Sequence, residues 1–141
     1  RWYTVAMAPP MAADALGLPV PSLADLVAEL TWPDQAVDVG WVETVGGPRS
    51  PIGADGDAVD LADVLDPDLV LLVADAGLGT VNSVRLGVDV LGPRPVVVFL
   101  NRYDATDDLH RRNLDWLRTR ERLEVIVDLE ALSNRMAGDP A

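Results

Sequence analysis

Apolar and polar residues follow two kinds of pattern along this chain. Nearly all-apolar runs at residues 69–74 and 95–100 have the length and character of strands buried on both faces of a parallel sheet. Shorter β-rich runs at 36–42 and 124–127 also predict strands. Apolar residues at helical spacing, with start and stop signals such as Ser22 followed by Asp25, predict helices elsewhere. The predicted helices cover residues 8–17, 23–30, 60–65, 80–91, 107–120 and 129–136.

The order of these elements favours one fold class. An apolar strand, a crossover helix and another apolar strand are typical of a parallel sheet with helices against it. We therefore expect a doubly wound, mostly parallel α/β fold. Because ligands of such sheets bind beyond the carboxyl ends of the strands, candidate site residues lie at 43–47, 75–82 and 101–104.

Glu43 follows the predicted strand at 36–42 and precedes the glycine pair Gly46 and Gly47. A carboxylate at a strand end could hold a magnesium ion, since a hard cation prefers oxygen ligands. The two glycines would let a substrate approach the backbone closely. The alternative is an ordinary turn with an acidic residue beside it.

Two further strand ends carry candidate residues. In the first, the N–H groups of Gly79, Thr80, Val81 and Asn82 would lie at a helix start, where they suit a carboxylate or a phosphate. The alternative there is a tight turn with Thr80 as the N-cap. In the second, Asn101 could recognise a purine edge with its amide, or it could cap a turn.

Composition limits the class of protein. The 141 residues are 49% hydrophobic, which is enough for a buried core. The absence of cysteine excludes disulfides and cysteine nucleophiles and fits the cytosol. No apolar run reaches the roughly 18 residues of a membrane helix. A net charge of −12 argues against nucleic-acid binding.

One feature of the charged residues bears on chemistry. All 11 basic residues are arginine, and lysine is absent. This chain alone can therefore complete no reaction that requires a lysine.

Four segments, in order, resemble the dethiobiotin synthetase family. They are the helix start Ala8-Pro9-Pro10-Met11-Ala12-Ala13, the segment Val42-Glu43-Thr44-Val45-Gly46-Gly47 with Pro51 after it, the run Ala76-Gly77-Leu78-Gly79-Thr80-Val81-Asn82, and the pair Asn101-Arg102. The third segment is the most specific match. The order and spacing of the four carry the resemblance.

The resemblance implies a P-loop NTPase-like fold and an ATP- and Mg²⁺-dependent ligase of biotin synthesis. Such enzymes form homodimers and close a ureido ring from 7,8-diaminopelargonate and carbon dioxide. The implied site residues are Glu43 as a magnesium ligand, Gly46 and Gly47 beside substrate and phosphate, Gly79, Thr80, Val81 and Asn82 around the substrate carboxylate, and Asn101 and Arg102 in the nucleotide site, with Asn101 facing the adenine.

The chain also departs from the family. It contains no G-x-x-x-x-G-K-[ST] phosphate-binding loop. Thr44 replaces a family glycine, Pro48-Arg49-Ser50 replaces an apolar stretch, and 125–128 lacks a proline-containing nucleotide loop.

Since the first residue is Arg1, we expect a single domain, residues 1–141, that is the carboxyl-terminal part of a larger α/β domain whose P-loop strand and helix are missing. We expect that part to be cytoplasmic and inactive alone.

Two other functions remain open. A relative that lost its P-loop could serve as a non-catalytic interaction module. Another P-loop enzyme, such as an ATP-dependent amide synthase of cobalamin synthesis, shares the same architecture.

Overall fold

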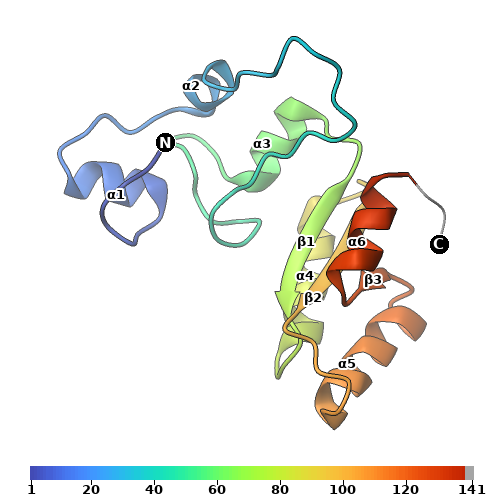
Figure 1. Cartoon of the computed structure of the whole chain (residues 1–141). Helices are drawn as coiled ribbons and strands as arrows, with labels where there is room; N and C mark the ends of the chain where they lie inside the picture. Colours follow the sequence, from blue (N-terminus) through green and yellow to red (C-terminus); the bar gives the residue numbers. More distant parts are fainter. Residues whose placement is uncertain (139–141) are drawn as a thin grey trace. The chain divides into compact units, whose positions relative to one another are not determined.

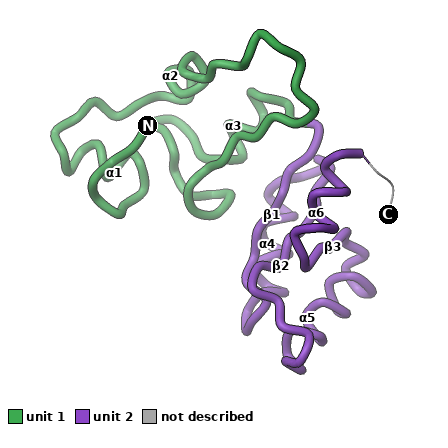
Figure 2. The backbone as a smooth tube through the Cα atoms, viewed as in Figure 1, with its two compact units in different colours: residues 1–67 green, residues 68–141 purple. Residues whose placement is uncertain are grey.

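The computed structural model describes residues 1–138 and divides the chain into two compact units. Unit 1 is residues 1–67 and unit 2 is residues 68–141 (Figure 2). The expectation of a single domain over residues 1–141 stays a prediction.

Unit 2 contains a three-stranded sheet. Its strands are β1 (Val70–Asp75), β2 (Val96–Asn101) and β3 (Glu124–Ile126), in the order β1-β2-β3, and both neighbouring pairs are parallel. The strands predicted at 69–74, 95–100 and 124–127 are confirmed to within about one residue. The parallel sheet is confirmed with them.

Helices cover both faces of this sheet (Figure 1). They are α4 (Thr80–Leu91), α5 (Asp108–Thr119) and α6 (Leu129–Met136). Side chains alternate in direction along a strand, so β2 contributes to two cores. Val98 and Leu100 pack with residues of α4 and α5, and Val97 and Phe99 pack with residues that include Leu132 of α6. Helices on both faces confirm the doubly wound α/β class.

Unit 1 contains three short helices, α1 (Pro9–Ala15), α2 (Leu23–Ala28) and α3 (Ala58–Leu65). Ser22 and Asp25 form the predicted capping box at the start of α2. A second capping box, made by Asp57 and Asp60, begins α3. Both boxes satisfy N–H groups that a helix leaves unpaired at its first turn.

The predicted strand at residues 36–42 is wrong. Within residues 1–67, all of which the structure describes, the only β contact is an isolated antiparallel bridge between Pro51 and Asp57. Val37, Val39 and Trp41 are between 39% and 57% exposed. A β-rich run forms a stable strand only when a neighbour accepts its hydrogen bonds and a core covers its face, and this segment has neither within its unit.

Among residues 1–138, no helix is both long enough and apolar enough to cross a membrane.

Candidate functional site

The carboxyl ends of β1 and β2 lie side by side in unit 2. Asp75 and Asn101 are the last residues of their strands and are partners in the register of the sheet. The next residue, Arg102, donates a hydrogen bond from Nη2 to Oδ2 of Asp75 at 2.6 Å. The sheet therefore brings together two of the three predicted strand ends, 75–82 and 101–104.

Asp75 also shapes the loop that follows it. Its Oδ1 accepts a hydrogen bond from the Gly77 N–H at 2.9 Å. This bond and the nearby Arg102 guanidinium hold the pKa of the Asp75 carboxyl below its usual range. Asp75 is therefore ionised at neutral pH, and its hydrogen bonds connect the loop after β1 to the loop after β2.

The start of α4 lacks a side-chain cap. Its N-cap is Gly79, at φ +91°, and no side chain accepts a hydrogen bond from the first turn. Thr80 is therefore not the N-cap, so that part of the alternative interpretation is wrong. Thr80 is 4% exposed, and its Oγ1 has no hydrogen-bond partner among the described residues. The Thr80 N–H donates to the Gly77 carbonyl at 3.4 Å. The other N–H groups of this first turn, together with the unpaired hydroxyl, suit an anionic ligand.

Asn113 of α5 belongs to this region, and it was not predicted from the sequence. Its Nδ2 donates to the carbonyl oxygens of Ala76 and Gly77, each at 2.9 Å. A usable signal was present in the sequence. Leu109 and Leu117 lie four residues to either side, so Asn113 interrupts the apolar stripe of an amphipathic helix. A buried polar residue in such a position needs a partner.

Asn101 is exposed at the end of β2. Its Oδ1 accepts a hydrogen bond from the Arg102 N–H at 3.0 Å, which is the turn-capping role left open by the sequence. Arg102 itself has φ +56°, a conformation that few residues other than glycine adopt. The Asn101 Nδ2 has no partner among the described residues, so its donor side remains available to a ligand.

The other predicted residues lie in unit 1. Gly46 has φ +75°, and the Gly47 N–H donates to the Ser50 Oγ at 3.0 Å. A Cβ atom on Gly46 would lie 2.5 Å from that Oγ. Ser50 of the same turn therefore occupies the close approach that Gly46 permits, whereas a Cβ atom on Gly47 would meet nothing within 4 Å.

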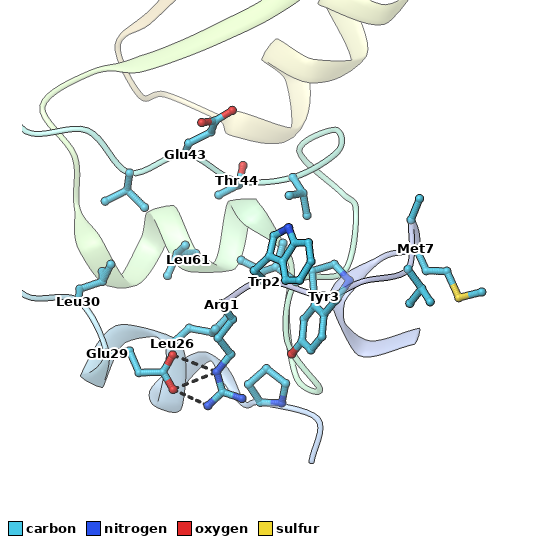
Figure 3. A pocket seen from close by; sticks show the side chains of 17 residues that line it. Arg1, Trp2, Tyr3, Met7, Leu26, Glu29, Leu30, Glu43, Thr44 and Leu61 are labelled. Atoms are coloured by element: carbon cyan, nitrogen blue, oxygen red, sulfur yellow. Dashed lines mark hydrogen bonds and ion pairs between the residues drawn. The ribbon is translucent and has the colours of Figure 1, made fainter. Parts of the chain in front are cut away.

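Glu43 is exposed on the wall of a cavity of about 550 Å³ within unit 1 (Figure 3). Its carboxylate points away from the ion pair that Arg1 makes with Glu29 on another part of the wall. Side chains from the first residues of the chain, α2 and α3 complete the lining.

The acidic residues limit what a metal site could be. Nowhere in residues 1–138 do three His, Cys, Asp or Glu side chains gather closely enough to hold a metal ion. Mg²⁺ is often bound by one or two carboxylates together with substrate phosphates. A lone Glu43 therefore fits an ion shared with a nucleotide and does not fit a site made by these residues alone.

Known proteins resemble this chain over most of its length. It is 35% identical over 140 residues to the ATP-dependent dethiobiotin synthetase BioD of Rhodococcus jostii, which is 96% of this chain and 60% of that protein. It is 41% identical over 91 residues to the dethiobiotin synthetase BioD of Rhodococcus erythropolis. The aligned segment covers 64% of this chain and 40% of that relative. The dethiobiotin synthetase BioD of Haloferax mediterranei is 38% identical over 77 residues. The aligned segment covers 52% of this chain and 33% of that relative.

No protein-family model and no solved structure matches the chain. The chain spans at most 60% of the length of these relatives. All three relatives are dethiobiotin synthetases. Over the matched residues, the chain is similar to a carboxyl-terminal portion of dethiobiotin synthetases.

Proposed function

We propose that this chain forms the substrate-carboxylate and nucleotide-base side of an ATP- and Mg²⁺-dependent dethiobiotin synthetase. The start of α4, residues 79–82, binds the carboxylate of 7,8-diaminopelargonate, across a homodimer interface in the intact enzyme. Asn101 and Arg102 contact the nucleotide, and Glu43 contributes one ligand to the magnesium ion. Gly46 and Gly47 lie near substrate and phosphate.

The observation that carries this proposal is the uncapped amino terminus of α4 at the carboxyl edge of a parallel sheet. The macrodipole of a 12-residue helix and the first-turn N–H groups other than that of Thr80 stabilise a negative charge there. The Thr80 Oγ1 is the only buried side-chain polar atom without a partner in the described part of unit 2. A bound carboxylate would satisfy both kinds of group.

The phosphate-binding loop must come from other residues in this scheme. A P-loop uses a lysine beside the phosphates, and the chain has none. We infer that the full-length enzyme supplies this lysine from residues outside the 141. The chain by itself should then bind the diamino acid without turning over ATP.

Binding is tested by titrating the chain with 7,8-diaminopelargonate while NMR follows the amide signals of residues 78–82. The control ligand is the same diamine with its carboxylate converted to a carboxamide. The carboxylate form should bind at least about tenfold more tightly, since charge-assisted hydrogen bonds are the stronger ones. Equal affinity for the two ligands, or shifts confined to other residues, would contradict the carboxylate site.

Catalysis is tested on the full-length protein. With 7,8-diaminopelargonate, bicarbonate and MgATP it should form dethiobiotin, detected by mass spectrometry. Replacement of Glu43 by Gln should lower the rate and raise the Mg²⁺ concentration needed for half-maximal rate. The control is Glu29→Gln, since the Glu29 carboxylate pairs with Arg1 in the same unit.

A second function is favoured by the missing lysine. A protein that has kept the sheet and lost phosphate binding would act as a non-catalytic interaction module. Calorimetry of the full-length protein with MgATP separates the two proposals, because the module should release no heat of binding.

A further inference from the structure

The loop between β1 and α4 is held in place by α5. Asn113 is 9% exposed, and both of its amide hydrogens have carbonyl partners, Ala76 and Gly77. An amide that faces two carbonyl oxygens must present its nitrogen to them, because its own oxygen would only repel them. The orientation of the Asn113 side chain is therefore determined by these partners.

The two hydrogen bonds fix two successive peptide planes. A trans peptide is planar, with its C=O and N–H pointing in opposite directions. The plane between Ala76 and Gly77 is held at both ends, by Asn113 at the carbonyl and by Asp75 at the N–H. The next plane is held by Asn113 at the Gly77 carbonyl. The Leu78 N–H must consequently point away from the Asn113 amide.

We propose that Asn113 is a positioning residue for anion binding at the start of α4. It sets the direction of the N–H groups that lead into the first turn of the helix and does not touch the ligand itself. This inference rests on the proposed function, which assigns residues 79–82 to the substrate carboxylate.

A purely structural role for Asn113 makes a different prediction. Packing of α5 against the rest of unit 2 is carried by apolar residues such as Leu114 and Leu117. If Asn113 only stabilised the fold, its loss would weaken every ligand equally. If it positions the loop, its loss should weaken a ligand that uses the N–H groups and spare one that does not.

The test uses three substitutions of graded chemistry in the full-length protein. Asn113→Ser keeps one donor, Asn113→Ala keeps none, and Asn113→Asp places oxygens against the two carbonyls. The control is Leu114→Ala, which loosens packing of the same helix and leaves both hydrogen bonds in place.

The first readout is the ratio of affinities for 7,8-diaminopelargonate and its carboxamide. This ratio should fall by about tenfold in Asn113→Ala, as expected for the loss of two hydrogen bonds, and should fall less in Asn113→Ser and most in Asn113→Asp. Leu114→Ala should keep the wild-type ratio. An unchanged ratio in Asn113→Ala, or the same fall in Leu114→Ala, would overturn the inference.

The second readout needs no ligand and separates this inference from the proposed function. The Gly77 N–H donates to Asp75, and the Thr80 N–H donates to the Gly77 carbonyl that Asn113 also holds. Exchange of these two amide hydrogens, measured by NMR, should accelerate about tenfold in Asn113→Ala and stay unchanged in Leu114→Ala. If the wild-type protein bound 7,8-diaminopelargonate no more tightly than its carboxamide, the proposed carboxylate site would be overturned. Exchange that is unaltered in Asn113→Ala would overturn the positioning role, whatever the ligand result.

Discussion

At the scale of single residues, Asp75 has the most consequential contacts in the candidate site. It accepts from the Gly77 N–H and from Arg102, so one carboxylate joins the loops after β1 and β2. Both interactions are stronger with the ionised carboxylate than with the neutral acid. The stability that they contribute is present above the pKa of Asp75 in the unfolded chain, and it is lost as the pH falls through the lower pKa of the folded state.

We therefore predict that the Gly77 amide signal titrates with a midpoint below 3.8, the ordinary value for an aspartic acid. NMR spectra recorded between about pH 2 and 6 would measure it. The Asp75→Asn variant should show no such transition at Gly77. A midpoint at or above the ordinary value would mean that the Gly77 and Arg102 interactions do not form in solution.

Gly46 provides a second test at this scale, because its left-handed conformation and the nearby Ser50 both exclude a side chain. Gly46→Ala should lower the free energy of unfolding by about 1–2 kcal/mol. Thermal unfolding would measure the difference. The matched control is Gly47→Ala, since a Cβ atom added to Gly47 would have nothing within 4 Å, and it should change stability by less than about 1 kcal/mol. Equal effects of the two changes would contradict the turn geometry.

At the scale of elements, β2 is the central strand and supplies both cores of unit 2. Leu100 of β2 is fully buried against the helices α4 and α5, whereas Val73 on the neighbouring strand is 57% exposed. The two positions therefore differ in what a truncation removes.

Leu100→Ala should lower the free energy of unfolding by about 2–5 kcal/mol, because it removes buried methyl groups and leaves a cavity. Val73→Ala should cost less than about 1 kcal/mol, as at other exposed positions. Urea unfolding followed by circular dichroism compares the two variants with wild type. Similar losses would show that β1 and β2 are not packed as described.

At the scale of the whole chain, the two units differ in what they bury. Apart from Pro21 and Gly53, the buried apolar residues of unit 1 are Ala12, Ala13, Ile52, Val59 and Leu61. Unit 2 fully buries larger side chains, among them Val84, Val97, Val98, Leu100 and Leu117. Local stability rises with buried apolar contacts.

Hydrogen exchange followed by mass spectrometry should therefore show slow exchange over residues 96–101 and much faster exchange over residues 31–47. The difference should persist at low denaturant concentration, where global unfolding does not yet dominate. Equal protection of the two segments would mean that unit 1 contains a core beyond the one described.

Much of this protein was determined by the sequence acting locally. Ser22 and Asp25 begin α2 because both cap partners lie within one helical turn. The strands β1 and β2 could be predicted because their residues are apolar throughout, and the edge that holds Asp75, Gly79 and Asn101 follows from parallel pairing. The family resemblance, carried by the order and spacing of four segments of which 76–82 is the most specific, also needed only the sequence.

Tertiary structure decided what depends on partners far apart in the chain. The run at 36–42 has strand-like residues and forms no strand, because no neighbouring segment of its unit pairs with it. Asn113 reaches carbonyl groups 36 and 37 residues earlier, and Arg102 reaches an aspartate 27 residues earlier. A hydrogen bond of that kind exists only once folding has brought its two groups together. The pattern of neighbouring residues could mark Asn113 as a polar residue that needs a partner, but it could not identify the partner.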